Sequence, residues 1–303
     1  MPIKVELKNK IIDGKIISGL LIEKLSAAIS ELSKKDIKPT LAVVLIGDDP
    51  ASQVYVRNKK IMCEKVGIQS VEYKFAVDIK ESELLSLIDS LNRDKGINGI
   101  LVQFPIPPHI SKQKTINAIS PGKDVDGLHP INAGKLMNNI ECLTPCTPQG
   151  SMIMINSIVE DTSGMNAVVL GRSNLVGKPM SQLLTNANCT VTQVHSKTKD
   201  IKSFTSQADI LVAAIGIPNF VKSDWVKKDA IIIDVGINRV ESDQNATAKT
   251  KLVGDVDFED VFDKVSAITP VPGGVGLMTV ACLMNNRKRK PVRIWRSVCV
   301  GYL

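Results

Sequence analysis

Apolar residues follow helical and strand spacings in alternation through the first half of the chain. After Asp13-Gly14 they recur every three or four positions up to Leu32, which predicts an amphipathic helix. A second helix is expected from residues 48–50 to Val66, because Pro50 suits a first turn and Gly67 a helix end. The other elements predicted here are strands at 41–46, 70–75 and 97–103 and a helix at 81–92.

The second half of the chain repeats the alternation with five apolar strands. They are predicted at 166–170, 190–194, 210–215, 230–235 and 266–268. A helix at about 150–160 leads into these strands, and another that begins near Met278 returns from them. Strands that alternate with helices indicate an α/β fold built on parallel sheets.

Two domains with a cleft between them are the expected architecture. An N-terminal βαβ domain over residues 1–122, completed by a helix at about 278–286, is expected to carry the catalytic chemistry. A Rossmann-like, doubly wound domain is expected over residues 123–277. It includes the connection 121–150, which is dense in Pro, Gly, Asn and Asp and is a candidate functional loop.

The composition is that of a globular protein, with 44% hydrophobic and 23% charged residues. No apolar run is long enough to cross a membrane, and the N-terminus resembles neither a signal nor a transit peptide. We therefore expect a cytoplasmic protein without a membrane partner. Six cysteines without a Cys-x-x-Cys pair, and only three His, predict free thiols in a reducing compartment and no metal site.

The net charge of +7 is concentrated at the C-terminus. Residues 287–303 hold six Lys and Arg and no acid, so the rest of the chain is nearly neutral. No specific nucleic-acid partner is expected. Because Pro291 would break a helix and the apolar periodicity stops, this basic tail is expected to add neither catalysis nor a folded element. It is either a replaced or shifted terminus, or a natural tail for an anionic partner.

A phosphate-binding turn is predicted after the strand 166–170. Gly171 ends the strand, and Arg172, Ser173, Val176 and Gly177 lead into a helix whose N-terminus favours an anion. Ser173 stands where a dinucleotide-binding turn usually has its second glycine. A purely structural turn is therefore the alternative interpretation of this segment.

NADP is favoured over NAD by the residues that follow the second strand of this domain. NAD-binding folds place an acid there to bind the ribose, whereas this chain has His195-Ser196-Lys197-Thr198. Hydroxyls and cations attract a 2′-phosphate, and Arg172 lies in the preceding turn. Further candidate contacts at strand ends, whose alternative role is simple turn formation, are Gly216, Gly236 and Ile237.

A possible substrate-binding helix face is formed by Ser52, Tyr55 and Lys59. Their spacings of three and four place them together on the second helix. From spacing alone, Tyr55 and Lys59 could equally be an amphipathic surface pair.

Seven segments, in order, resemble the bifunctional methylenetetrahydrofolate dehydrogenase/methenyltetrahydrofolate cyclohydrolases. The resemblance spans about residues 1–284. The segments are Tyr55-Val56-x-x-Lys59, Gly99-Ile-Leu-Val-Gln103-Phe-Pro105-Ile-Pro107, Lys123-Asp124-Val125-Asp126-Gly127, Pro145-Cys146-Thr147-Pro148, Gly171-Arg172-Ser173-x-x-Val176-Gly177, Asp234-Val-Gly-Ile-Asn238 and Thr269-Pro-Val-Pro-Gly-Gly-Val-Gly276.

The resemblance implies NADP-dependent oxidation of 5,10-methylenetetrahydrofolate and hydrolysis of the methenyl product to 10-formyltetrahydrofolate. Lys59 matches the family's catalytic lysine, Gln103 the glutamine that positions it, and Tyr55 the aromatic residue that stacks on folate. Asp126 matches the acid that grips the pterin, although a solvated Asp-Gly turn is its alternative. A homodimer is also implied. The other implied substrate contacts are Ser52, Val102, Phe104, Pro272, Gly273, Gly274, Val275 and Gly276.

The chain departs from this family pattern in two places. Leu277 stands where the family usually has Pro, and the C-terminus is unusually basic. Two other functions therefore stay open. One is a monofunctional dehydrogenase, which the presence of both Lys59 and Gln103 disfavours. The other is an inactive binding protein whose basic tail does the work.

Overall fold

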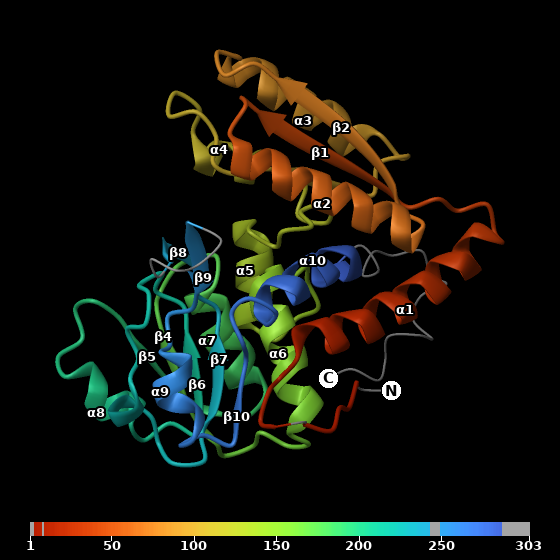
Figure 1. Ribbon diagram of the computed structural model, residues 1–303. Helices are drawn as coiled ribbons and strands as arrows, with labels where there is room; N and C mark the ends of the chain where they lie inside the picture. Colours follow the sequence, from red (N-terminus) through yellow and green to blue (C-terminus); the bar gives the residue numbers. More distant parts are fainter. Residues whose placement is uncertain (1–2, 8, 243–248, 287–303) are drawn as a thin grey trace. The chain divides into compact units, whose positions relative to one another are not determined.

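A computed structural model describes residues 3–7, 9–242 and 249–286 (Figure 1). The chain divides into two compact units, which we call the three-stranded and the five-stranded unit after their main sheets. Within the described residues, the three-stranded unit comprises Leu21–Pro145 and the chain from Val280 onward. The five-stranded unit comprises the chain up to Leu20 and Cys146–Thr279. Each is a layered α/β structure with parallel pairing in its main sheet, which confirms the predicted fold class.

The three-stranded sheet has the order β2-β1-β3. Its strands are β1 (Thr40–Ile46), β2 (Gln69–Phe75) and β3 (Gly99–Val102), and every residue of β1 is buried. Alternate β1 side chains pack with α3 (Glu81–Arg93) in one core cluster. Because strand side chains alternate between faces, the others point to the side where α2 (Pro50–Val66) crosses β1 and β2 (Figure 1).

Helix α2 begins and ends where the sequence predicts. The Asp49 carboxylate accepts a hydrogen bond from the Ser52 amide at 2.8 Å, and Pro50 occupies the first turn. Gly67 ends the helix in the left-handed region, at φ 81°, where a side chain would be strained. Fixed ends hold Tyr55 and Lys59 at defined positions along the helix. The other long helix, α1 (Gly14–Ser33), passes from one unit to the other between Leu20 and Leu21.

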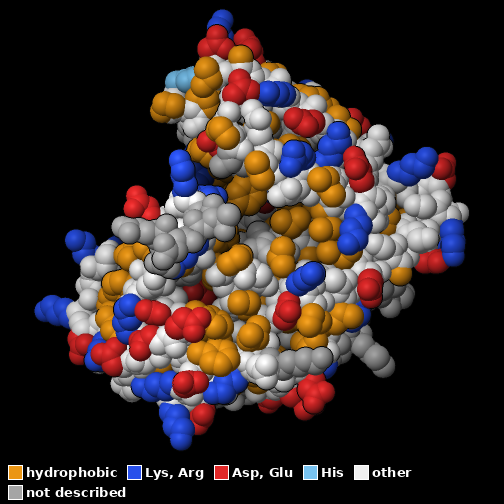
Figure 2. Space-filling view, in the orientation of Figure 1, with side chains coloured by type: hydrophobic (Ala, Val, Ile, Leu, Met, Phe, Trp, Pro, Cys, Tyr) orange, Lys and Arg blue, Asp and Glu red, His pale blue; other side chains and the backbone are white. Residues whose placement is uncertain are grey.

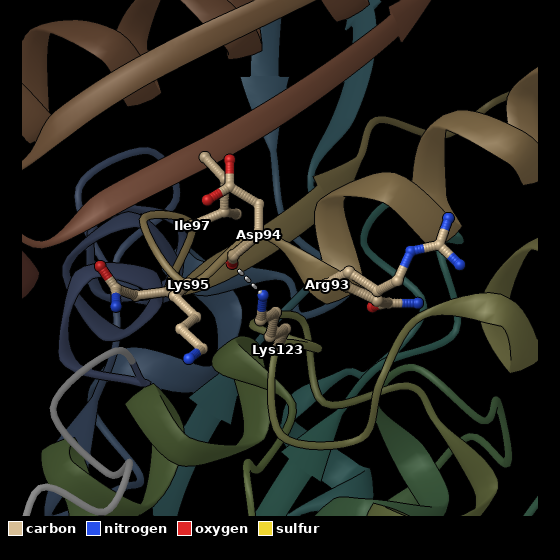
Figure 3. A pocket seen from close by; sticks show the side chains of 7 residues that line it. Arg93, Asp94, Lys95, Ile97 and Lys123 are labelled. Carbon is tan, nitrogen blue, oxygen red and sulfur yellow. Dashed lines mark hydrogen bonds between the residues drawn. The ribbon is translucent and has the colours of Figure 1, made fainter.

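The segment 123–145 belongs to the three-stranded unit, whereas the sequence pattern assigns it to the second domain. Lys123 Nζ donates to the carbonyl of Leu91 and, as Figure 3 shows, to that of Asp94 at the end of α3. The Lys123 carbonyl accepts from the Ile100 amide. The expected irregular connection also contains helix α5 (Pro130–Met137), which follows the short helix α4 (Lys112–Ala118). These contacts are between residues far apart in sequence, so local patterning does not reveal them.

The five-stranded sheet has the order β10-β7-β6-β4-β5, with all pairs parallel. The chain runs from β4 to the neighbouring edge strand β5, then returns to the other side of β4 at the central strand β6. This reversal is the switch point beside which doubly wound sheets bind ligands. The strands are β4 (Asn166–Leu170), β5 (Thr190–Val194), β6 (Ile210–Ala213), β7 (Ile231–Asp234) and β10 (Ala267–Ile268). The longer helices of this unit are α6 (Cys146–Ile158) and α7 (Gly177–Asn186).

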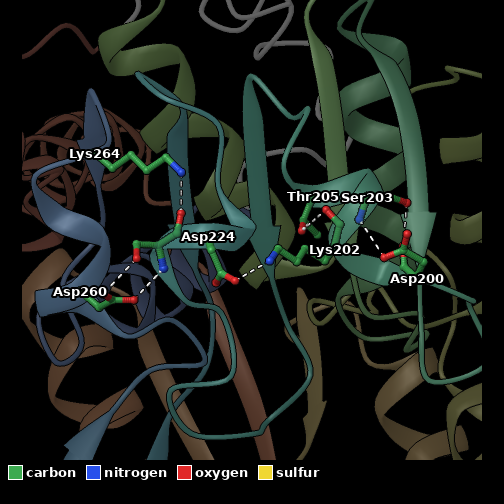
Figure 4. A network of polar contacts seen from close by, with 8 residues as sticks. Asp200, Lys202, Ser203, Thr205, Asp224, Asp260 and Lys264 are labelled. Carbon is green, nitrogen blue, oxygen red and sulfur yellow. Dashed lines mark hydrogen bonds and ion pairs between the residues drawn. The ribbon is translucent and has the colours of Figure 1, made fainter.

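Several short elements of this unit were not expected from the sequence. They are the antiparallel pair β8 (Asn238–Glu241) and β9 (Thr250–Val253), helix α9 (Phe258–Phe262) and a 3-10 turn at Ser223–Trp225. The short helix α8 (Ile201–Thr205), by contrast, lies between two strands where a helix was expected. Apolar side chains such as Trp225, Phe258 and Val261 pack these short elements on the core, and polar side chains fix their ends. The Asp200 carboxylate caps α8, Lys202 pairs with Asp224, and the Asp260 carboxylate accepts from Ser223 (Figure 4).

The returning helix is α10 (Val275–Asn286), as predicted near Met278. The basic tail at 287–303 lies outside the described residues, so its expected lack of structure stays a prediction. Within the described ranges, no helix is long and apolar enough to cross a membrane. Charges of both signs are interspersed over the face that Figure 2 shows.

Candidate functional site

A lysine–glutamine pair lies at the carboxyl end of β3. Lys59, half-buried on α2, donates from Nζ to Gln103 Oε1 at 2.9 Å. Gln103 follows the strand directly, and its Nε2 donates to the Phe104 carbonyl at 2.7 Å. This second bond fixes the amide so that its oxygen faces the lysine. The structure therefore brings together the two residues that the resemblance makes catalytic.

The half-buried Asp126 lies in the turn after the parallel bridge between Ile100 and Asp124. Desolvation raises its pKa to about 6, although the nearby positive charge of Lys59 lowers it and Asp124 raises it further. Asp124 is itself buried and accepts from the His129 amide at 2.8 Å and from Asn132 Nδ2 at 3.0 Å. These bonds fix the Asp124 carboxylate at the start of the turn that carries Asp126. The charge of Lys59 acts on Asp126 directly.

The other predicted contacts of this unit differ in exposure. Ser52 is 3% exposed and Val102 is 2% exposed, whereas Tyr55, on the same helix face as Lys59, is 50% exposed. Phe104 is half-buried, with Lys112 Nζ lying 4.8 Å from its ring centroid. Tyr55 and Phe104 can offer rings to a ligand, while Ser52 and Val102 are placed to shape the wall behind it.

Gly171 and Gly177 are required by the close approach of backbone segments in the five-stranded unit. Gly171 has φ 126°, and a Cβ there would overlap the Ala214 carbonyl beyond β6. A Cβ on Gly177 would overlap the Gly171 carbonyl, so α7 could not start against the end of β4. These are the roles of the first and third glycines in a dinucleotide-binding turn.

Ser173 changes how this turn can bind an anion. Its Oγ accepts from the amides of Val176 at 3.1 Å and Gly177 at 3.4 Å, and its carbonyl accepts from the Lys178 amide. The sequence predicts free amides at the start of the following helix, but the structure shows that these three donate to Ser173. An anion at this turn must therefore rely on the side chain of Arg172 and on the amides that precede Val176.

Arg172 and Ser196 occupy neighbouring positions at the carboxyl edge of the sheet. Leu170 pairs with Val194 in the parallel register of β4 and β5, and each residue lies two positions beyond that pair. Arg172 and Ser196 are both exposed. His195, which lies between the end of β5 and Ser196, is half-buried. A cation and a hydroxyl that follow adjacent strand ends, without an acid in the turn 195–198, fit a nucleotide that carries a 2′-phosphate.

The turns after β6 and β7 carry the remaining predicted cofactor residues, Gly216, Gly236 and Ile237. Both turns are held by a residue that sequence analysis missed, the fully buried Asp255. An Asp after Gly254 in a polar stretch gives no sequence signal that distinguishes it from a surface turn. Only the structure shows that its carboxylate is enclosed.

The glycine-rich loop Pro272–Gly276 and the turn after β7 line one cavity of about 140 Å³ in the five-stranded unit. Gly273 has φ 107°, and a Cβ on Gly274 would overlap the Pro270 carbonyl. Ile237 and Leu252 also face this cavity. Leu277, 44% exposed, lines it too, and its amide donates to the Gly274 carbonyl at 3.3 Å, a bond that proline could not make. The predicted folate loop and predicted cofactor residues therefore adjoin.

A second cavity, of about 260 Å³, lies at the opposite end of β3 from Gln103. It is lined by the end of α3 and by Lys123 (Figure 3) and contains none of the predicted site residues. Lys123 is engaged with backbone carbonyls. The cavity is therefore separate from the lysine–glutamine pair and from the predicted cofactor turns.

Two family models match the chain. Residues 12–126 match the tetrahydrofolate dehydrogenase/cyclohydrolase catalytic domain, and residues 145–292 match the NAD(P)-binding domain of the same family. Two bacterial relatives are each called bifunctional protein FolD. The one from Parvibaculum lavamentivorans is 52% identical over 91% of this chain and 93% of its own length. The one from Wolbachia pipientis is 55% identical, with the same coverage of both chains.

Solved structures give the same result. The bifunctional methylenetetrahydrofolate dehydrogenase/cyclohydrolase of Campylobacter jejuni superposes with a TM-score of 0.88 at 47% identity, covering 91% of this chain and 96% of that one. The Trypanosoma brucei enzyme, solved with NADP cofactor and an inhibitor, superposes with a TM-score of 0.85 at 35% identity, covering 95% and 97%. With both domains matched in order, this chain belongs to the tetrahydrofolate dehydrogenase/cyclohydrolase family.

Proposed function

We propose that this chain oxidises 5,10-methylenetetrahydrofolate with NADP and hydrolyses the methenyl product to 10-formyltetrahydrofolate. The observation that carries the proposal is the bond between Lys59 and Gln103, together with the coupled Asp126. The three-stranded unit would supply the folate chemistry and the five-stranded unit would bind the nucleotide. The two family models, a catalytic and an NAD(P)-binding domain, support this division.

Hydrolysis requires a group that can move a proton beside the methenyl carbon. Water adds to this electron-poor carbon and gives up a proton, the bond from that carbon to one folate ring nitrogen breaks, and that nitrogen takes up a proton. Lys59 is half-buried, so its charge acts in a partly desolvated setting, and Gln103 Oε1 fixes the direction of its Nζ. Gln103 is thus a positioning residue, and Lys59 is the residue that transfers the proton.

Asp126 is suited to hold the pterin. The pterin edge offers an N–H and an exocyclic amine side by side, and a carboxylate can accept both. The partial burial that raises the pKa of Asp126 to about 6 also strengthens such charged hydrogen bonds, because less water competes for them than at the surface. Tyr55, half-exposed on the same helix face as Lys59, would stack on the folate ring.

The dehydrogenase step depends mainly on how the cofactor is held. When bound, NADP supplies the hydride acceptor, and the protein supplies orientation. Arg172 and Ser196 would bind the 2′-phosphate from adjacent strand ends, while Gly171 and Gly177 let the backbone come close. The absence of an acid in the turn 195–198 supports NADP over NAD.

A homodimer and a cytoplasmic location remain predictions. The resemblance supports the dimer, and six cysteines without a Cys-x-x-Cys pair favour a reducing compartment. Light scattering of the purified chain would test the dimer directly, because a mass of one chain would contradict it.

The proposed function can be tested by substituting two adjacent lysines on α2 and comparing the variants. Lys59→Met should lower hydrolysis of methenyltetrahydrofolate by roughly 100-fold or more, because the proton-transferring group is gone, while NADP binding stays unchanged. Lys60→Met removes an exposed cation from the next position and serves as the control. Equal hydrolysis by the two variants would refute the role of Lys59.

A further inference from the structure

The carboxylate of Asp255 binds both turns that follow β6 and β7. Its Oδ2 accepts hydrogen bonds from the amides of Ile215 at 2.7 Å and Gly216 at 3.0 Å. Its Oδ1 accepts from the Ile217 amide at 3.0 Å and from Asn238 Nδ2 at 2.9 Å. The residue is fully buried. Four donors from the two turns converge on one enclosed, charged acceptor, so the carboxylate holds both turns in one arrangement.

Asp255 is itself fixed to the sheet through Asp234, the last residue of β7. The Asp255 amide donates to Asp234 Oδ1 at 2.9 Å, and the same oxygen accepts from the Gly236 amide at 2.9 Å. Asp234 Oδ2 accepts from the Val256 amide, also at 2.9 Å. A Cβ on Gly236 would overlap the Asp255 carboxylate, so the turn packs directly on it. The two turns are therefore positioned relative to β7.

These turns present apolar side chains where a dinucleotide is expected. Ile217 is 47% exposed and Ile237 is 51% exposed, each at the carboxyl end of its strand. Dinucleotides bind across the carboxyl ends of open parallel sheets, and flat apolar rings pack well on branched side chains. The phosphate-binding turn is tied to the same framework, because Gly171 approaches the Ala214 carbonyl just before Ile215.

We propose that Asp255 is a positioning residue for NADP, an inference that rests on the proposed function. By engaging the amides of residues 215–217, it makes this turn an apolar support for the cofactor rather than a phosphate site. The phosphates then depend on the turn after β4, where Arg172 lies. Asp255 does not touch the cofactor; it acts through Ile217 and Ile237.

The test compares Asp255→Asn with Asp257→Asn. Asparagine has nearly the same size as aspartate, but an NH2 group replaces one of the two acceptor oxygens. Because each oxygen of Asp255 accepts two hydrogen bonds, the NH2 group would face two donors in either orientation. Direct titration should show the NADP Kd rising about tenfold or more, as expected when buried bonds of this kind are lost. Hydrolysis of methenyltetrahydrofolate without nucleotide should fall far less than NADP affinity, because Lys59, Gln103 and Asp126 belong to the other unit and only the predicted folate loop adjoins the turn after β7. Asp257 caps α9 and pairs with Lys222, so its Asn variant should leave both measurements unchanged.

Three results would decide against the proposal or its premise. An unchanged NADP Kd in Asp255→Asn contradicts the positioning role. A parallel loss of NADP affinity and nucleotide-free hydrolysis contradicts it too, because that marks a purely structural residue. If the unaltered protein binds no NADP, the proposed function itself fails. Should Asp255→Asn not fold, Asn238→Ala removes a single bond to the carboxylate and must still weaken NADP, or the proposal is wrong.

Discussion

Burial and a neighbouring cation act in opposite directions on the carboxyl group of Asp126. Desolvation raises its pKa to about 6, while Lys59 opposes the rise. Lys59 also depends on its surroundings. Its hydrogen bond to the side-chain amide oxygen of Gln103 fixes the direction in which the ammonium group points. At the scale of the residue, function is thus produced by placing ordinary side chains in partly desolvated positions.

Asp126→Asn should stabilise the protein at neutral pH while weakening folate binding. The folded pKa of about 6 lies above the ordinary value of 3.8, so the native state loses stability as pH rises from about 4 to 6. Asparagine does not titrate, so the variant should gain up to about 3 kcal/mol above pH 6 and nothing below pH 4. Urea unfolding at both pH values measures this, and a pH-independent difference would contradict the assigned burial.

Arg172→Ala and Ser196→Ala should each weaken NADP by about 1–3 kcal/mol, the magnitude of a charge-assisted hydrogen bond. NAD binding should change far less, because the lost contact is to the 2′-phosphate. Titration with both nucleotides checks this. If the unaltered protein binds NAD as tightly as NADP, the argument from the missing acid after β5 is wrong.

Elements in which regular apolar spacing extends over many residues could be predicted from the sequence. Short elements whose ends are fixed by polar side-chain bonds could not. Helices α1, α2 and α3 and the buried strands follow the pattern of apolar residues. The β8–β9 pair and α9 are too short for a periodic signal, and the carboxylates nearby, such as Asp255 and Asp260, bond residues distant in sequence. The role of Ser173 was missed for a similar reason, since a cap depends on backbone geometry.

Helix α10 contributes more than the apolar closing face that its sequence predicts. Asn286, at its last described position, is 1% exposed and donates from Nδ2 to the carbonyls of Val125 at 2.9 Å and Thr144 at 2.6 Å. Val125 directly precedes Asp126 in its turn. The element thus holds a loop of the three-stranded unit.

Asn286→Ala should destabilise the protein by about 2–3 kcal/mol, because two buried carbonyls lose their donor. Asn285→Ala, at the preceding half-buried position, is the matched control and should cost much less. Urea denaturation of both variants measures the difference. Equal losses would show that the bonds to Val125 and Thr144 contribute little.

At the scale of the whole molecule, two separately built units supply two kinds of chemistry. The three-stranded unit carries the lysine, glutamine and aspartate, and the five-stranded unit carries the glycine turn, Arg172 and Ser196. The site residues became recognisable from the sequence only through their combined resemblance to one family, because each motif alone fits a surface helix or a turn. Their distances and burial needed the structure.

The most direct test of the bifunctional assignment is turnover of methenyltetrahydrofolate by the purified chain without any nucleotide. Loss of the methenyl absorbance should be catalysed, because hydrolysis consumes no nucleotide and Lys59, Gln103 and Asp126 belong to the unit that does not carry the predicted cofactor turns. Adding NADP with methylenetetrahydrofolate should then produce NADPH. NADPH formation without hydrolysis would mean a monofunctional dehydrogenase, and the absence of both reactions would mean a binding protein; either result would contradict the bifunctional assignment.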